Sequence, residues 1–146
     1  MLNPYLIVTS AADAISFYVN VFGAKELFRL VTPDGKIIHA EISVFDTKVM
    51  LSDEHPNMGY KSPQTLQGSP VSMHALVPDV DALFANALSA GATEVMAVAD
   101  QFYGDRRGTL VDPFGHIWLL ASKNEVVSYE VIVQRFAKLI SGESAV

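Results

Sequence analysis

His39 and Glu41 are an imidazole and a carboxylate separated by one position in a mainly apolar segment. Side chains two positions apart on a β-strand point to the same side, so this spacing would bring the two groups together. The pair could transfer protons or bind a divalent cation, or it could form a simple hydrogen-bonded surface couple. His74 could likewise line a cleft or be a hydrogen-bonded core residue. The candidate catalytic residues are therefore His39, Glu41 and His74.

A second polar cluster, Tyr103-Gly104-Asp105-Arg106-Arg107, combines an aromatic ring, a flexible glycine and two cations. Such a loop suits the rim of a binding cleft. An arginine can bind a carboxylate or a phosphonate through two parallel hydrogen bonds. The alternative is an ion pair between Asp105 and an arginine that only fixes the loop. The sequence predicts that Tyr103 and Arg107 contact a ligand.

Composition limits the kinds of partner. The absence of cysteine excludes disulfides, thiolate nucleophiles and cysteine-bound metal centres. The net charge of −6, with Arg106-Arg107 as the only basic concentration, argues against nucleic acid and anionic membranes. No run of about 18 apolar residues and no basic N-terminal segment occurs, so we expect neither a membrane span nor a signal peptide. A soluble, cytoplasmic protein that binds small molecules is expected.

The apolar pattern divides the first half of the chain into a strand, a helix and three more strands. The helix, over residues 12–22, has Thr9 or Ser10 as its N-cap and ends at Gly23. The turn Thr32-Pro33-Asp34-Gly35 separates two β-rich segments and indicates a hairpin. The predicted strands comprise residues 2–8, 25–31, 36–45 and 48–53.

The second half of the chain repeats this plan. A shift of 68 residues aligns Asp13 with Asp81 and Gly23 with Gly91. We therefore predict one α+β domain over residues 1–146, built from two tandem βαβββ modules and a C-terminal helix. Its predicted parts are module one (about 2–53), a connecting loop (54–70), module two (71–122) and the helix (127–141). The loop, with His55, Met58 and Tyr60, could act as a lid or simply connect the modules.

Several motifs resemble those of a known family. They are the Gly-Ala pair after each first helix, Asn3-Pro4-Tyr5-Leu6, the segment from Pro33 to Glu41, Leu51-Ser52-Asp53-Glu54, and Asp112-Pro113-Phe114-Gly115-His116-Ile117-Trp118. Together with the tandem modules, they resemble the vicinal oxygen chelate superfamily of glyoxalases, bleomycin resistance proteins and ring-cleaving dioxygenases, and within it the PhnB-like branch. The resemblance covers residues 2 to about 122. It implies curved sheets around a cleft, usually in a homodimer.

Metal-using members of this superfamily hold a divalent ion with His or Glu from the first and fourth strands of each module. The resemblance places these ligand positions at Asn3, Leu51, Ser72 and Leu119. None of the four is a good ligand for a catalytic divalent cation. We therefore expect no cofactor, or a divalent metal at a non-standard site only.

Strand alternation predicts what the cleft contains instead. On residues 37–45, Ile38 shares the face of Ala40, Ile42 and Val44, which should pack under a helix, and His39 and Glu41 share the opposite, cleft face. Leu51 and Asp53 are expected on that cleft face as well. The predicted ligand-binding set is Tyr5, His39, Glu41, Asp53, His74, Tyr103, Arg107 and Thr109. In contrast, His116 is expected to be structural and Trp118 to pack against a helix.

The sequence thus favours a small-molecule-binding protein, with a metabolite or drug held between curved sheets without obligatory metal. The first alternative is a glyoxalase-like lyase or isomerase that uses a displaced metal or an acid/base site. The second is a dimerising accessory domain with a vestigial cleft. A homodimer is expected in each case.

Overall fold

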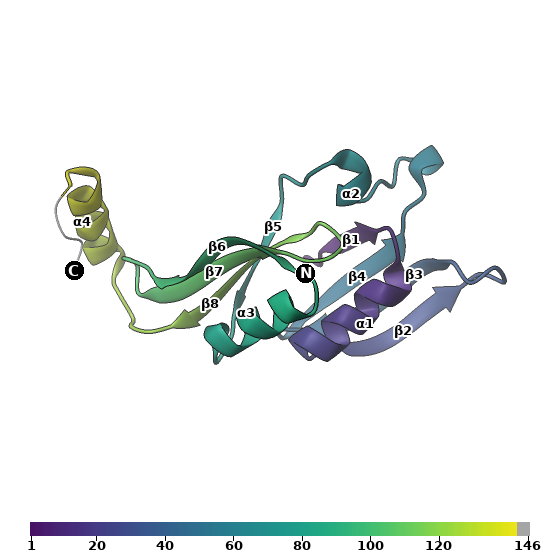
Figure 1. The fold of residues 1–146 in the computed structure, drawn as a ribbon, viewed down its shortest axis with the longest axis horizontal. Helices are drawn as coiled ribbons and strands as arrows, with labels where there is room; N and C mark the ends of the chain where they lie inside the picture. The colour runs from purple at the N-terminus through teal and green to yellow at the C-terminus, as the bar shows by residue number, and fades with distance from the viewer. Residues whose placement is uncertain (143–146) are drawn as a thin grey trace.

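The computed structural model describes residues 1–142 and shows two β-α-β-β-β modules followed by a helix (Figure 1). Module one comprises β1 (Tyr5–Val8), α1 (Ala11–Phe22), β2 (Lys25–Val31), β3 (Ile37–Val44) and β4 (Thr47–Asp53). Module two comprises β5 (Ser72–Leu76), α3 (Val80–Ser89), β6 (Thr93–Asp100), β7 (Asp105–Val111) and β8 (Ile117–Lys123). The α+β fold predicted from the internal repeat is confirmed.

Each module forms one four-stranded sheet whose first strand lies parallel to its fourth. The strand orders are β1-β4-β3-β2 and β5-β8-β7-β6, so β1 and β5 each pair along one edge only. Contacts with α1 cover one face of the first sheet, and contacts with α3 cover one face of the second. The opposite face of each sheet, called the open face below, carries half-buried and exposed side chains.

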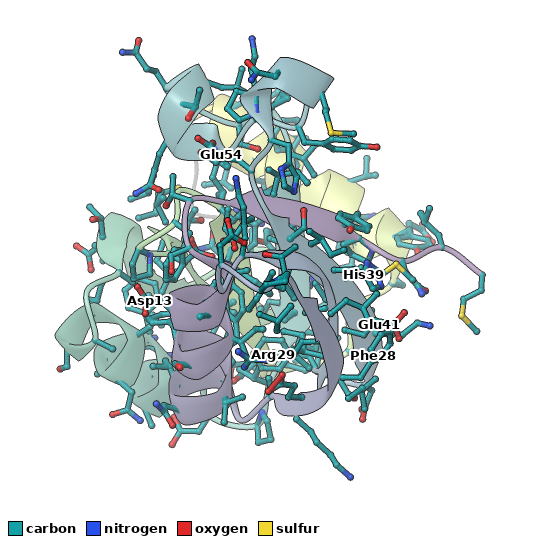
Figure 2. The ribbon with its side chains drawn as sticks, turned by 90° about the vertical axis from the view of Figure 1, so that its right-hand side faces the viewer. Asp13, Phe28, Arg29, His39, Glu41 and Glu54 are labelled. Carbon is teal, nitrogen blue, oxygen red and sulfur yellow. The ribbon has the colours of Figure 1, made fainter. Side chains whose placement is uncertain are left out.

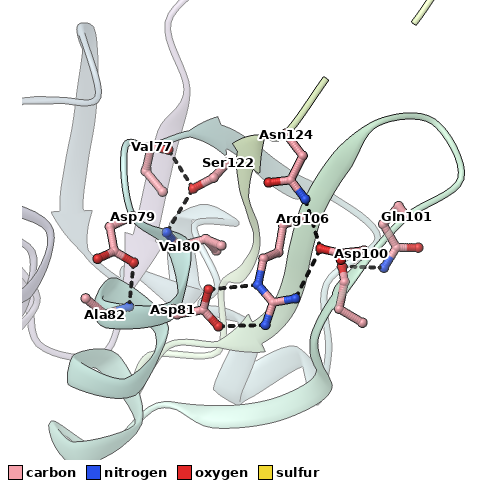
Figure 3. A network of polar contacts seen from close by, with 11 residues as sticks. Val77, Asp79, Val80, Asp81, Ala82, Asp100, Gln101, Arg106, Ser122 and Asn124 are labelled. Atoms are coloured by element: carbon pink, nitrogen blue, oxygen red, sulfur yellow. Dashed lines mark hydrogen bonds and ion pairs between the residues drawn. The ribbon is translucent and has the colours of Figure 1, made fainter. Parts of the chain in front are cut away.

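A side chain at the end of each fourth strand holds the start of that module's helix. The Asp53 carboxylate accepts hydrogen bonds from Ala11 N (2.6 Å) and Ile37 N (2.7 Å). In module two, Ser122 Oγ accepts a hydrogen bond from Val80 N at 2.9 Å (Figure 3). The prediction that Asp53 lies on the cleft face is wrong, because both of its oxygens bond to backbone at the helix-covered side.

Leu51 also lies on the helix-covered face. It pairs with Leu6 in β1 and Ala40 in β3, and all three residues are at most 5% exposed. Paired residues point to the same side of a sheet, so the open-face residue of β4 is Met50, which pairs with Tyr5. The prediction for Leu51 is wrong because the modules align at a spacing one residue longer than the shift used: Leu51 matches Leu120, as the helix N-cap Ser10 matches Asp79.

Strand β3 departs from simple alternation at its beginning. The β2–β3 register shifts between Leu30 and Val31, which is a bulge-like irregularity. Ile38 is consequently 45% exposed whereas Ile37 is 1% exposed. The prediction that Ile38 packs under a helix is therefore wrong, although the rest of that face is buried as expected: Ala40, Ile42 and Val44.

A buried carboxylate links the two modules beneath α1 and α3. Asp112, 3% exposed, accepts hydrogen bonds at Oδ2 from Tyr18 Oη (2.5 Å) and Trp118 Nε1 (2.9 Å). At Oδ1 it accepts from the backbone N–H groups of Phe114 (2.9 Å) and His116 (3.0 Å). Burial, with the negative charge of Asp112 adding to it, raises the pKa of the Tyr18 phenol, which therefore stays protonated. Trp118 packs against a helix, as predicted.

The connecting segment and the C-terminal region contain three further helical elements. Residues 54–70 contain the short 3-10 helix η1 (Pro56–Met58) and α2 (Pro63–Leu66), which the sequence did not predict. The C-terminal helix α4 (Tyr129–Ile140) extends away from the sheets at one end of the long axis (Figure 1). Within residues 1–142, no helix is both long enough and apolar enough to cross a bilayer.

Candidate functional site

The open face of module one carries a chain of four polar side chains. Tyr5 Oη lies 2.9 Å from His39 Nδ1, and His39 Nε2 lies 3.4 Å from Glu41 Oε1. Lys48 Nζ approaches the other oxygen of Glu41 at 3.5 Å. The side chains of His39 and Glu41 are 23% and 16% exposed, so the pair is shielded without being closed off. We call Tyr5, His39, Glu41 and Lys48 half-site one.

One tautomer of His39 connects all three groups. When its Nε2 donates a hydrogen bond to the carboxylate of Glu41, the unprotonated Nδ1 can accept one from the hydroxyl group of Tyr5. The order Tyr5–His39–Glu41 has the logic of an acid–base relay, in which a carboxylate orients an imidazole and the imidazole polarises a hydroxyl group.

Apolar side chains surround half-site one. The ring of Phe28, 44% exposed, lies 5.7 Å from that of His39, and Figure 2 shows Phe28, His39 and Glu41 on one side of the sheet. Phe28 pairs with Glu41 across β2 and β3, and Met50 pairs with Glu41 across β4. Sequence reasoning missed Phe28, Met50 and Lys48, because only the strand register shows that they share this face.

The open face of module two carries the second group of predicted residues. Leu119 pairs with His74 on one side and with Thr109 on the other, so the three side chains share a face. Arg107 lies two positions from Thr109 on the same strand and therefore on that face. We call His74, Arg107 and Thr109 half-site two.

Arg107 of half-site two carries a positive charge that no anionic group neutralises within residues 1–142. Within residues 1–142 its guanidinium group makes no hydrogen bond or ion pair, and its Cζ lies over the ring of Tyr103, 5.7 Å from the ring centroid. The Tyr103 hydroxyl is itself buried without a hydrogen-bond partner in that part of the chain. This cation is therefore available to an anionic group.

Arg106, its neighbour, has a different environment. It donates hydrogen bonds to Asp81 at 2.8 and 2.9 Å and to Asp100 at 3.1 Å (Figure 3). Hydrogen bonding from Arg106 holds the pKa of the Asp81 carboxyl below its usual range. The alternative of an ion pair between Asp105 and an arginine is wrong, because Asp105 pairs with Lys123 at 2.7 Å.

The two half-sites do not face each other within one chain. Among the regular elements of the two modules, α1 and α3 are in contact with each other, and these helices lie on the covered faces of their sheets. The open faces consequently point away from the contact between the modules. One chain therefore supplies two halves of a site on separate open faces. Its modules also line cavities between them, and one of about 520 Å³ includes His74 together with Pro4 and Val49 of module one.

The residues at the superfamily's metal-ligand positions do not fit a divalent metal. With the register corrected, these positions are Asn3, Met50, Ser72 and Leu119, and they offer an amide, a thioether, a hydroxyl and a hydrocarbon. Hard or borderline cations prefer carboxylate and imidazole ligands. Over residues 1–142, no group of three His, Asp or Glu side chains is placed to hold a metal ion.

A cavity of about 600 Å³ lies between the modules, separate from Arg107 and His74. Its walls come from β1, β5 and the connecting segment, including Ile7, Met73, Pro63 and Leu66. His116, predicted to be structural, borders this cavity and places Nε2 3.0 Å from Ile7 O. The connecting segment contributes to these walls, whereas its predicted lid residues do not: His55, Met58 and Tyr60.

Substitution of Asp53 distinguishes a structural role from a ligand-binding role. We expect Asp53→Ala to lower the free energy of unfolding by about 2 kcal/mol, because two backbone N–H groups lose a charged acceptor. Chemical denaturation followed by circular dichroism measures this change. Asp13→Ala, on the exposed first turn of α1, is the control and should change stability far less. Unchanged stability in Asp53→Ala would contradict the structural role.

Comparison with known proteins agrees with this architecture. Residues 2–120 match the family model described as Glyoxalase/Bleomycin resistance protein/Dioxygenase superfamily. An uncharacterized protein from Mycobacterium bovis is 50% identical over 134 residues, which is 90% of this chain and 88% of the relative.

Two solved structures show the same fold. The crystal structure of protein PA1353 from Pseudomonas aeruginosa has a TM-score of 0.71 and 24% identity, covering 86% of this chain and 98% of that one. A PhnB protein from Bacillus cereus, described as a putative 3-demethylubiquinone-9 3-methyltransferase, has a TM-score of 0.67 and 17% identity, covering 83% and 98%. Because the family model matches most of its length, the chain belongs to the glyoxalase/bleomycin resistance protein/dioxygenase superfamily.

Proposed function

We propose that this protein binds a compact aromatic anion, a metabolite or a drug, in a cleft that requires no metal. The observation that carries the proposal is Arg107, a guanidinium group without an anionic partner in the described chain. A carboxylate or phosphonate group would satisfy it through paired hydrogen bonds. The rings of Tyr103 and Phe28 and the side chains of Met50 and Leu119 supply the apolar contacts that an aromatic ligand needs.

The cleft is proposed to form between two copies of the chain. Half-site one of one copy would face half-site two of the other, and a two-fold axis would create two equal clefts. The support is that the open faces of a single chain point away from its own module contact. The resulting cleft would combine the relay of Tyr5, His39 and Glu41 with Arg107 and His74 of the second copy.

We also propose that the chain belongs to the PhnB-like branch of its superfamily and acts in the cytoplasm. The supporting observations are the sequence motifs around Asp34 and Asp112, together with the fold shared with the PhnB protein. A binding or sequestering role is consistent with ligand positions that lack metal donors.

The relay of half-site one favours a second candidate function, an acid/base lyase or isomerase. Tyr5 Oη would donate a proton to the substrate or accept one from it. His39 Nδ1 would correspondingly return a proton to Tyr5 or take one from it, while Glu41 orients the imidazole ring. His39 and Glu41 with His74 of the second copy could alternatively form a displaced metal site. Metal analysis of protein purified without chelator tests this form: stoichiometric metal that disappears in both His39→Ala and Glu41→Ala would contradict the metal-free proposal.

A thermal-shift screen tests the binding proposal. Ligands that bind only the native state raise the melting temperature by mass action. We expect benzoate or phenylphosphonate analogues to raise it, whereas neutral counterparts such as benzamide should have little effect. If no member of a broad panel of aromatic anions, metabolites and antibiotics raised the melting temperature, the proposal would be overturned in favour of an accessory domain with a vestigial cleft.

A further inference from the structure

Helix α4 presents an apolar stripe that is largely uncovered. Tyr129, Val133, Phe136 and Ile140 recur at the spacing of one helix face and are 89, 66, 50 and 73% exposed. No residue of α4 is buried, although Ser128 caps its N-terminus by accepting a hydrogen bond from Val131 N. Helices shorter than about 12–15 residues are only marginally stable alone. The α4 stripe therefore needs an apolar surface to pack on.

A small number of contacts attach α4 to its own module. Arg135 Nη1 donates to Phe102 O at 3.0 Å and to Glu125 Oε1 at 2.6 Å. The Phe136 ring lies 5.8 Å from that of Phe102. Ahead of the helix, Glu125 N donates to Gly104 O at 3.1 Å. These contacts fix the position of α4 while leaving most of its apolar surface free.

The opposite end of the chain carries a second apolar patch. Phe28 and Leu30 of β2 are 44 and 48% exposed and pair with Glu41 and His39 on the open face, and we call them the β2 patch. β2 is an edge strand, and natural proteins usually cover or charge such edges. In Figure 1, α4 and β2 lie at opposite ends of the longest axis. One chain therefore cannot bring its own stripe and patch together.

The total exposed surface indicates that a second molecule covers these regions. The chain exposes 8527 Å² at a mass of 15.9 kDa. A folded monomer of this mass exposes about 7,350 Å², so the excess is about 1,200 Å². Each partner in a standard-size interface buries about 800 Å². The excess is large enough for a stable dimer.

We propose that the α4 stripe of one copy packs on the β2 patch of a second copy, and that the reciprocal contact forms at the other end. A two-fold axis across the long dimension of the molecule satisfies both surfaces at once and leaves no open contact for further growth. This inference rests on the proposed two-copy assembly. Because Leu30 pairs with His39 and Phe28 with Glu41, α4 walls the cleft beside half-site one.

Cross-linking tests the contact directly, because the natural chain contains no cysteine. Full-length Val133→Cys and Leu30→Cys proteins are mixed and incubated until their subunits have exchanged, and the mixture is treated with a short bismaleimide. One of the two proteins is isotope-labelled, so that mass spectrometry identifies which chains each product joins. We expect the main product to join one chain of each kind. A dimer that gives only 133–133 products, or none, would overturn the α4 contact and leave the two-copy cleft standing. A protein that sedimentation shows to be monomeric would overturn both.

A matched pair of charge substitutions measures what the contact contributes. Val133→Glu places a carboxylate within the α4 stripe, whereas Gln134→Glu places the same group on the polar face of the same turn. We expect Val133→Glu to raise the dimer dissociation constant by at least about tenfold and Gln134→Glu to change it less than about twofold. Helix content by circular dichroism controls for unfolding of α4. Equal dissociation constants for the two variants would overturn the proposal.

Discussion

Asp112→Asn is expected to lower the free energy of unfolding by about 3 kcal/mol. The Asp112 carboxylate accepts four hydrogen bonds, two at each oxygen, from Tyr18, Trp118 and two backbone N–H groups. An amide has one oxygen, so whichever way it turns, two donors face an NH₂ group and lose their acceptor. Each buried unsatisfied group costs about 1–3 kcal/mol. Urea unfolding followed by far-UV circular dichroism measures the loss.

A hairpin turn of module one with the same hydrogen bond supplies the control for this substitution. Thr32 begins the turn between β2 and β3, and its N–H donates to Lys36 O as that of Asp112 donates to His116 O. Thr32 Oγ1 accepts a single backbone hydrogen bond, from Lys36 N at 3.1 Å. We expect Thr32→Ala to cost less than about 1 kcal/mol. Similar losses for Asp112→Asn and Thr32→Ala would contradict the role of Asp112 as the link between the modules.

Arg107→Ala is expected to weaken binding of an aromatic carboxylate or phosphonate about 10- to 100-fold. A hydrogen bond to a charged group contributes about 1.5–3 kcal/mol, and each 1.4 kcal/mol changes the dissociation constant tenfold. Little stability should be lost, because Arg107 makes no hydrogen bond or ion pair within the described residues. Calorimetric titration with an anion identified by the thermal-shift screen measures the affinity.

Arg106→Ala is the matched control, because it removes the same group one position away. Arg106 bonds to Asp81 and Asp100 on the helix-covered side, so its loss should leave the ligand affinity nearly unchanged. It should instead release the Asp81 carboxyl, whose pKa would rise toward the ordinary value. Equal affinity losses in the two variants would show that only the overall charge matters, and an unchanged affinity in Arg107→Ala would remove this residue from the site.

The repeat in the sequence predicted the fold, because the residues that repeat are those that determine local structure. Asp13 and Asp81 both lie in the first turns of their helices, and Gly23 and Gly91 both follow the helix ends with positive φ, because polar first turns and chain reversal depend on local residue types. Turn chemistry likewise predicted the hairpin at Gly115, whose φ is +91°. Local signals of this kind survive in the folded chain because neighbouring residues determine them.

The site was less predictable, because strand register depends on contacts between distant segments. Leu51 and Met50 differ by one position, and a one-residue difference exchanges the faces of a sheet. The bulge near Val31 similarly exposed Ile38. His39 and Glu41 could be paired from their spacing alone, whereas the contact of Tyr5 with His39 spans 34 residues and needed the parallel pairing of β1 with β4.

The central claim is that half-site one of one copy and half-site two of another form each cleft, and mixed dimers test it most directly. The measurement is the binding stoichiometry of an aromatic anion that passes the screen, using His39→Ala chains, Arg107→Ala chains and their exchanged mixture. Each variant alone has a defect in both clefts, whereas a mixed dimer has one intact cleft and one doubly defective cleft. Mixing is expected to restore tight binding at one site per mixed dimer. A mixture that binds no better than the two variants measured separately would contradict it.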